Sequence, residues 1–176
     1  MDTGLLVLRM VVGLLLVGHG TQKLFGWFGG GGLTGTAWFF RSHGYRPPRL
    51  MAGLAGSGEV AGGAALAVGL MTPLAAAIVI GTMLNAAVMH RRNGLWVVDN
   101  GYEYPLLIAA VAVTLSFTGA GAASLDARLG LGGAGIGSGL FAVALGLAAG
   151  SAVLLSRAIG VPTRRSALIR IPGGSL

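Results

Sequence analysis

Five stretches of mostly apolar residues, separated by short polar segments, dominate the sequence. A helix that crosses a membrane needs about 20 largely apolar residues, each adding about 1.5 Å of length. We therefore predict one membrane-spanning helix in each stretch. Their approximate bounds are 4–26, 50–70, 73–90, 105–119 and 135–156.

The connections between these stretches constrain their arrangement. Only Met71 and Thr72 separate the second stretch from Pro73, where the third begins, and proline suits the first turn of a helix. The second and third helices should therefore form an antiparallel hairpin. The fourth stretch is the shortest, because a helix over 105–119 would cover only about 22 Å of an apolar core about 30 Å thick. It would be tilted little or begin before the proline. Residues 119–135 are expected to form a loop.

The composition supports a membrane protein. Of the 176 residues 54% are hydrophobic and 10% are charged, against about 25% charged in soluble domains, and the mean hydropathy is +0.80. We predict an all-α membrane protein: a four-helix transmembrane bundle plus a fifth C-terminal transmembrane helix, in contact with membrane lipids. No polar block is long enough for a second domain, so residues 1–156 form the bundle and 157–176 a basic tail.

The positive charge is distributed unevenly between the two ends of the predicted bundle. The net charge is +7, but the basic residues lie at the ends of apolar stretches, which indicates topology and excludes a nucleic-acid-binding protein. With five spans, the loops of one face hold only Arg128. The other face holds Arg41, Arg46, Arg49, Arg91, Arg92, Arg157, Arg164, Arg165 and Arg170. We expect a bacterial inner-membrane protein with its N-terminus outside and its C-terminus in the cytoplasm.

Ionisable residues inside membrane helices are costly, and they usually face the bundle interior, a cavity or a partner. In the first span Arg9, His19 and Lys23 lie near a stripe of small residues that includes Gly13 and Gly20. We consider all three candidate ligand-binding residues. Alternatively, Arg9 and Lys23 extend to the two membrane surfaces, and His19 hydrogen-bonds a neighbouring helix.

The second and third spans add further candidates. Glu59 shares a helix face with Gly56 and Gly63, so it should face a neighbouring helix; it is either a catalytic proton carrier or half of a structural ion pair. Asn85 and His90 in the third span are candidate ligand-binding residues. The alternative for His90 is a cap at the helix C-terminus.

The segment "DNGYEYP", residues 99–105, is a turn before the fourth span, which we expect to begin at the proline. Glu103 is a candidate catalytic residue and Tyr104 a candidate ligand-binding residue. Alternatively, Glu103 is a solvated helix cap and the tyrosine belongs to the aromatic belt of the membrane surface. His19 and His90 lie on the same side of the membrane, as axial ligands of a haem would, but neither has a diagnostic spacing. We therefore do not expect haem, and the sequence indicates no metal site.

An ordered series of segments, covering about residues 5 to 126, resembles the DoxX family of small bacterial membrane proteins. The segments are "LRMVVGLLLVGHGTQKLFGWFGGGGLTGTAWFF", "LAGSGEVAGGAALAVGLMTPLAAA", "MLNAAVMH", "NGYEYPLLI" and "GAGAASLD". The resemblance implies a bundle usually of four spans, related to the DoxD subunit of a thiosulfate:quinone oxidoreductase. It also implies a link to a mycobacterial membrane oxidoreductase complex with superoxide dismutase and a sulfurtransferase. The fifth span and the basic tail depart from that pattern.

These observations favour a membrane subunit of a redox complex with a quinone or electron-donor site at the cytoplasmic end. The sequence has no cysteine and no recognisable haem or flavin motif, so we expect electrons to come from a protein partner rather than from this chain alone. A non-catalytic scaffold that recruits a soluble enzyme is the alternative, and a small-solute or proton transporter is third. The GxxxG spacings at Gly135/Gly139 and Gly146/Gly150 suit internal packing, a homo-oligomer or a partner contact.

Overall fold

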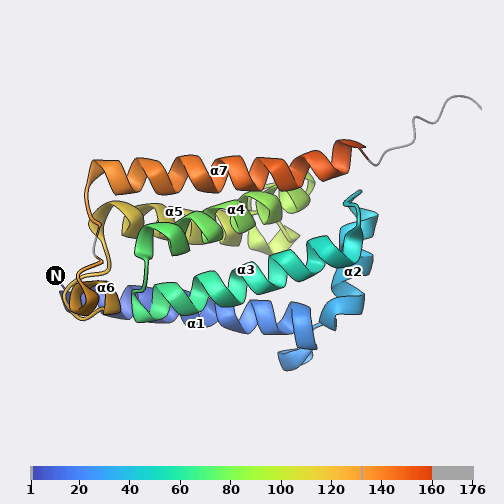
Figure 1. Cartoon of the computed structure of the whole chain (residues 1–176). Helices are drawn as coiled ribbons and strands as arrows, with labels where there is room; N and C mark the ends of the chain where they lie inside the picture. The colour runs from blue at the N-terminus through green and yellow to red at the C-terminus, as the bar shows by residue number, and fades with distance from the viewer. Residues whose placement is uncertain (1, 132, 160–176) are drawn as a thin grey trace, which may run out of the picture.

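The helices of the computed structural model follow the predicted apolar stretches (Figure 1). The structure describes residues 2–131 and 133–159, with side chains up to Arg157. Within this part of the chain, helices of 16 to 24 residues form the body of the molecule, and the all-α fold class is confirmed. They are α1 (Asp2–Phe25), α3 (Pro48–Val68), α4 (Thr72–His90), α5 (Glu103–Thr118) and α7 (Ile136–Ile159).

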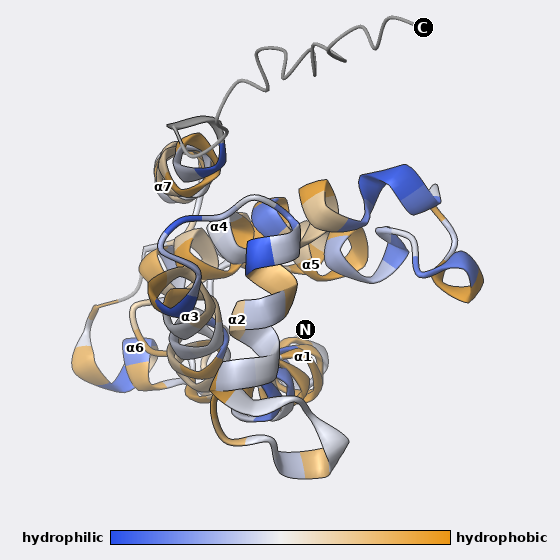
Figure 2. Cartoon of the chain, turned by 90° about the vertical axis from the view of Figure 1, so that its right-hand side faces the viewer, coloured by the Kyte–Doolittle hydropathy of each residue, from blue (hydrophilic) through white to orange (hydrophobic). Residues whose placement is uncertain are grey.

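Helix α4 has a central place in the bundle. It contacts α3, α5 and α7, whereas α1 packs mainly against α3. Figures 1 and 2 accordingly show α1 and α7 on opposite sides of the middle helices. One buried apolar cluster, which includes Leu16 of α1, Leu66 of α3, Val79 of α4 and Leu115 of α5, joins these helices. The interior is therefore continuous from α1 to α5.

Several helices have the length and composition of membrane spans. Among the described residues, α1, α3, α4 extended to Asn93, and α7 are long and apolar enough to cross a membrane. The chain is therefore a multi-pass membrane protein. Helix α5 is shorter, as the sequence indicated, and α7 forms the expected C-terminal helix. That α7 crosses the membrane together with the other four helices stays a prediction.

The predicted hairpin of the second and third helices is present. Helix α3 ends at Val68, the backbone turns through Gly69 and Met71 at positive φ, and α4 begins at Thr72. The carboxylate of Asp126 accepts hydrogen bonds from the Met71 and Thr72 backbone N–H groups at 2.6 and 2.9 Å and from the Thr72 hydroxyl at 2.6 Å. This carboxylate therefore caps α4 from a distant part of the chain.

The structure decides two expectations about the connecting segments: a loop throughout residues 119–135 was wrong, and a fourth helix that begins before the proline is confirmed. Residues 119–135 are not entirely a loop, because Leu125–Leu129 form the short helix α6, whose N-cap Ser124 accepts a hydrogen bond from Ala127 N–H. Helix α5 begins at Glu103 rather than at Pro105. A proline fits within the first turn because the N–H that it lacks has no partner inside the helix.

The segment between α1 and α3 contains a helix that the sequence pattern did not indicate. After the 3₁₀ turn η1 (Trp27–Gly29), the chain reverses through Gly29 and Gly32 at positive φ, and α2 (Gly32–Ser42) packs against α1 and α3. Phe40 of α2 and Tyr45 are buried there. The glycine run supplies the turn, and α2 covers one end of the bundle.

The contact between α1 and α3 depends on glycines. A Cβ atom on Gly20 would lie 2.6 Å from the Gly56 carbonyl oxygen, and one on Gly63 would lie 2.6 Å from the Gly13 carbonyl oxygen. Real Cβ atoms do not approach oxygen so closely, so the two backbones can meet only because these positions lack side chains.

Glycines also bring α7 against α4. A Cβ atom on Gly146 would lie 2.7 Å from the Ala77 carbonyl oxygen, and one on Gly150 would lie 2.9 Å from the Gly81 carbonyl oxygen. The GxxxG spacing at 146/150 therefore serves internal packing. Helix α7 is part of the bundle rather than an appendage.

Six of the eight arginines that the structure describes gather at one end of the bundle. They lie at the end of α2, in the connection to α3 or in the first turn of α3, just after α4, or near the end of α7. Figure 2 looks onto this end and shows the hydrophilic residues on its turns. The six are Arg41, Arg46, Arg49, Arg91, Arg92 and Arg157. Arg128 lies in α6, at the opposite end (Figure 1).

We expect Gly20→Ala to lower the free energy of unfolding by about 1–3 kcal/mol, because the added methyl group overlaps the backbone of α3. The matched control is Gly18→Ala in the same helix, since a Cβ atom there has no neighbour within 4 Å. This control should be neutral or stabilising by up to about 1 kcal/mol, since alanine favours helix. Reversible unfolding in detergent measures both, and equal effects would contradict the glycine contact.

The arginine-rich end should face the cytoplasm. Because the natural sequence has no cysteine, Ser42→Cys and Arg128→Cys each introduce a single thiol at opposite ends. An impermeant maleimide applied to spheroplasts should label the cysteine at 128 readily and the one at 42 only after permeabilisation. The reverse pattern would overturn the predicted orientation.

Candidate functional site

A cavity of about 380 Å³ opens near the arginine-rich end, among α1, α3, α4 and the start of α5. It brings together five of the eight predicted site residues: His19, Lys23, Glu59, His90 and Tyr104. The rest of the lining consists of Leu16, Met83, Ala86, Val97, Asn100, Gly101 and Pro105. The walls are thus largely apolar with a few polar groups, which is the usual character of a small-molecule site.

Lys23 and Glu59 form an ion pair across the interface of α1 and α3. The ammonium nitrogen lies 2.7 Å from one carboxylate oxygen and 2.5 Å from the other. The Glu59 side chain is only 4% exposed and that of Lys23 is 29% exposed. A carboxylate so buried is costly without a cation, and Lys23 supplies that cation at hydrogen-bond distance.

His19 of α1 and Tyr104, at the start of α5, lie side by side in the cavity wall. Their ring centroids are 5.2 Å apart with planes tilted by 57°. The hydroxyl oxygen of Tyr104 is buried and has no hydrogen-bond partner among the described residues. Buried polar groups are nearly always paired, so this hydroxyl is available to a ligand or an ordered water.

His90 lies at the end of α4, where the chain leaves for α5. Its Nδ1 lies 2.8 Å from the Asn100 carbonyl oxygen, a distance that fits a hydrogen bond donated by the ring. This contact connects α4 to the loop that carries Val97, Asn100 and Gly101 into the cavity wall. His90 therefore holds the loop and also faces the cavity.

Glu103 does not line this cavity. Its carboxylate accepts a hydrogen bond from the Val97 backbone N–H at 2.9 Å, and its own backbone N–H donates to the Leu95 carbonyl oxygen at 2.8 Å. Both contacts stabilise the loop before α5. The structure thus places Glu103 behind the loop, whereas its predicted role as a proton carrier stays a prediction.

Arg9 and Asn85 lie away from the cavity. Arg9 is 1% exposed in α1, near the opposite end of the bundle, and its guanidinium donates to the Ala123 carbonyl oxygen. Asn85 donates to the carbonyl oxygens of Gly81 and Gly150 at 3.0 Å and accepts from the Tyr45 hydroxyl at 2.9 Å. In this arrangement Arg9 fixes the α5–α7 connection and Asn85 joins α4 to α7.

The sequence analysis missed the residues that the loop contributes. Val97, Asn100 and Gly101 reach the cavity only because the chain folds back between Gly94 and Glu103. The sequence did contain a signal for the part of the wall that α1 contributes, because Leu16, His19 and Lys23 recur at helical spacing on one face of this helix. No local pattern indicates which loop covers the opening.

The comparisons with known proteins identify a family for this chain. The DoxX family matches residues 4–92, which are 89 of the 176 residues and run from α1 to the turn after α4. This range is shorter than the resemblance seen in the sequence; it includes His19, Lys23, Glu59 and His90 and ends before Tyr104. No curated protein and no solved structure matches the chain. On the strength of the family match, this chain of membrane-spanning helices belongs to the DoxX family.

Proposed function

We propose that the cavity at the arginine-rich end binds the headgroup of a membrane quinone and that the chain is the membrane subunit of a redox complex. The observation that carries the proposal is the Lys23–Glu59 pair in the wall of a largely apolar cavity of about 380 Å³. Membership of the DoxX family supports a membrane protein, and the cavity supports the ligand class.

The lining residues fit a quinone headgroup. A quinone presents two carbonyl acceptors on a flat apolar ring, so it needs a donor near each carbonyl and apolar walls. Lys23 has one N–H donor beyond the two that Glu59 accepts, and the unpartnered Tyr104 hydroxyl is a second donor. Leu16, Met83 and Pro105 supply apolar walls.

A bound quinone supplies two-electron, two-proton chemistry, and the residues of this chain would hold and deliver the protons. Glu59 and Lys23 share protons within one buried pair, and His19 lies one helical turn before Lys23 on α1. His90 stands nearer the loop that covers the opening. In this proposal the electrons come from a partner protein, because the sequence contains no cysteine and no recognisable cofactor motif.

A scaffold that recruits a soluble enzyme is the second candidate. Arg41, Arg46 and Arg49 are exposed at the same end of the bundle and would present positive charge to an acidic partner. The tail arginines Arg164, Arg165 and Arg170 lie outside the described residues. Under this alternative, reversing the charge of the tail arginines releases the partner from an intact bundle and leaves quinone binding unchanged.

The two halves of the ion pair should respond unequally to substitution. We expect Lys23→Met to lower the free energy of unfolding by about 3–5 kcal/mol, because Glu59 is left buried without a cation. Glu59→Gln should cost less, about 1–3 kcal/mol, since Lys23 is partly exposed and can reach water. The double variant should recover much of the loss. Thermal or denaturant unfolding in detergent measures all three, and equal single losses with no recovery would contradict a coupled pair.

Menaquinone should stabilise the natural protein through Tyr104. In nanodiscs, we expect menaquinone to raise the unfolding temperature, and Tyr104→Phe to weaken this binding about fivefold through loss of one hydrogen bond. Tyr102→Phe is the matched control, because it removes the same hydroxyl group two residues away and Tyr102 does not line the cavity. If quinone has no effect at any concentration, or if both variants bind equally, the proposed site is wrong.

A further inference from the structure

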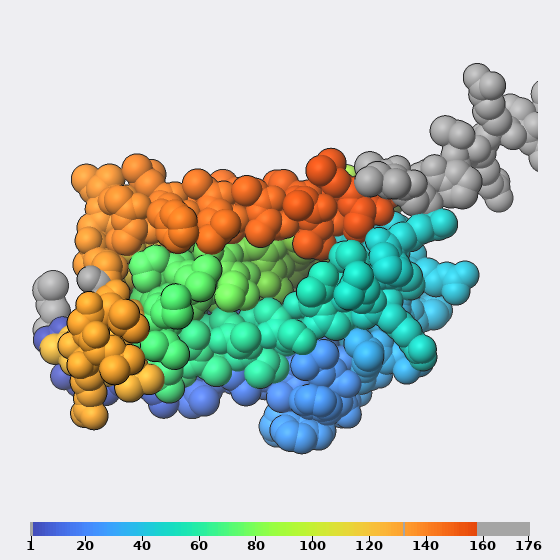
Figure 3. Space-filling model, viewed as in Figure 1, coloured from blue at the N-terminus to red at the C-terminus, as the bar shows by residue number. Residues whose placement is uncertain are grey.

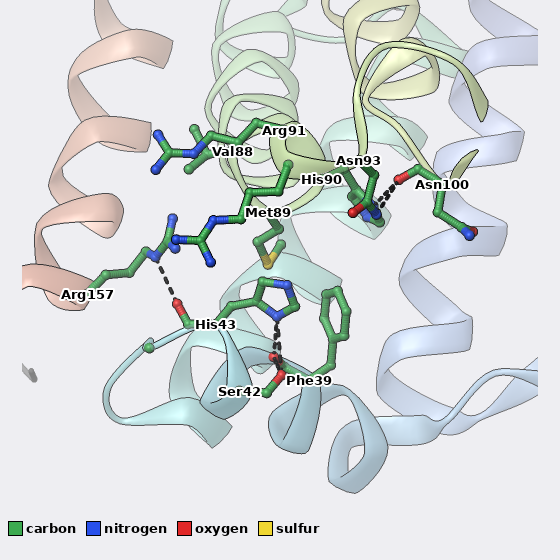
Figure 4. A pocket seen from close by; sticks show the side chains of 12 residues that line it. Phe39, Ser42, His43, Val88, Met89, His90, Arg91, Asn93, Asn100 and Arg157 are labelled. Carbon is green, nitrogen blue, oxygen red and sulfur yellow. Dashed lines mark hydrogen bonds between the residues drawn. The ribbon is translucent and has the colours of Figure 1, made fainter. Parts of the chain in front are cut away.

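A second cavity, of about 680 Å³, lies at the same end of the molecule, where α2, α4 and α7 end (Figure 4). We call it the basic basin; its charged members are Arg91, Arg92 and Arg157, with His43 and His90 beside them. In Figure 4, Arg91 and Arg157 lie on one side of the hollow, and His90, Asn93 and Asn100 lie on the other. His90 and Asn100 also line the first cavity, so the two cavities are neighbours.

The guanidinium groups of the basic basin have no acidic partner. Among the residues that the structure describes, none of the three arginines forms an ion pair. Arg157 is fixed in place, because its Nε donates to the His43 carbonyl oxygen at 2.9 Å and its guanidinium carbon lies 5.2 Å from the Tyr45 ring centroid. No described carboxylate neutralises its charge, so this positioned guanidinium can attract an anion.

This chain has few carboxylates to offer. The sequence contains five, and four of them are engaged elsewhere. Asp2 accepts from the Ala122 N–H, Glu59 pairs with Lys23, Glu103 accepts from the Val97 N–H, and Asp126 caps α4. The fifth, Asp99, is exposed next to Asn100 of the basin lining and forms no ion pair among the described residues, so no described carboxylate pairs with a basin arginine.

An apolar groove begins next to the basic basin. It runs between α3 and α7 over α4, which forms its floor, and Figure 3 shows this hollow between α3 and α7. Its lining includes Met51 and Leu54 of α3, Ile78 of α4 and Val153 of α7. The groove faces the side of the helices that a membrane would surround, where an acyl chain can lie.

The groove and the basin lie on successive turns of the same helix faces. On α4, Asn85 lines the groove and Met89, four residues later, lines the basin. On α7, Val153 lines the groove and Arg157, four residues later, lines the basin. Residues four apart lie above one another on a helix, so an anionic group in the basin and a hydrocarbon chain in the groove can belong to one molecule.

We propose that the basic basin binds the phosphate of an anionic phospholipid whose acyl chain lies in the groove between α3 and α7. The guanidinium groups of Arg91, Arg92 and Arg157 offer planar pairs of donors that match phosphate oxygens. Basic pockets between membrane helices on the cytoplasmic side suit acidic headgroups. A free phosphate would bind in the basin without occupying the groove. An acidic protein would contact the basin from outside and would also leave the groove empty.

The test compares two double variants with equal loss of charge. Arg91→Gln with Arg92→Gln removes two basin guanidiniums, and Arg41→Gln with Arg49→Gln removes two exposed arginines at the same end that do not line the basin. Native mass spectrometry after incubation with phosphatidylglycerol or phosphatidylcholine measures binding of each lipid. We expect the natural chain to bind phosphatidylglycerol more tightly than phosphatidylcholine. The basin variant should bind phosphatidylglycerol about tenfold more weakly than the natural chain, and the control variant should bind it as tightly as the natural chain does.

A second pair of variants tests the groove. Ala149 lines it, whereas the neighbouring Ala148 does not, and both are exposed. Ala149→Phe should weaken phosphatidylglycerol binding while leaving glycerol phosphate unaffected, and Ala148→Phe should change neither. Unfolding temperatures check that each variant remains folded.

Several outcomes would overturn the proposal. Equal binding of the two lipids, or equal loss in both arginine variants, would indicate general attraction between charges. Inorganic phosphate binding as tightly as the lipid would indicate a free-phosphate site. An acidic peptide that requires Arg91 and Arg92, with no preference for phosphatidylglycerol, would indicate a protein-docking surface.

Discussion

The close approach of α1 and α3 is the constraint on which the candidate site depends. Each of the paired charges follows a contact glycine by three residues: Lys23 follows Gly20, and Glu59 follows Gly56. Because residues three apart share a helix face, the contact that joins the backbones also brings the ammonium and the carboxylate together. A bulkier residue at either glycine would separate the helices and leave both charges without their partner in an apolar bundle.

The ion pair in turn explains how polar chemistry persists between apolar helices. Lys23 reaches toward the arginine-rich end and remains partly exposed, whereas Glu59 is enclosed. The pair therefore lies at the boundary between the protein interior and the loop region, where His19 and Tyr104 also lie. The neighbouring basic basin shares His90 with this cavity, so a ligand bound in one cavity would contact a residue that also lines the other.

Much of the architecture could be predicted from hydrophobic periodicity. The five apolar stretches became α1, α3, α4, α5 and α7, because long apolar runs leave few alternatives to membrane helices. Helix α2 was not predicted, since its eleven residues follow a glycine run and are too short to resemble a span. Short helix α6 depends on its own Ser124 cap within a segment that has the composition of a loop.

The candidate site was predicted in part. Glycine spacing indicated that Glu59 faces a neighbouring helix, whereas the choice of Lys23 as its cation depends on how α1 packs against α3. Arg9 and Lys23 share a stripe of one helix, but they lie fourteen positions apart and therefore near opposite ends of the bundle. Asn85 could not be assigned, because its partners Tyr45 and Gly150 come from distant segments. Pairings of this kind depend on tertiary contacts that no local pattern records.

The cap that Asp126 provides has a consequence for the order in which the protein matures during synthesis. The N–H groups of Met71 and Thr72 receive their acceptor from a residue made more than fifty positions later. The separation is larger for Arg9, whose acceptor, the Ala123 carbonyl oxygen, is made 114 positions later. The half of the chain that matches the family thus leaves the ribosome with one end of the bundle, the end opposite the arginines, still incomplete. That end closes only once α5 has been made and the segment after it has returned to the first helices.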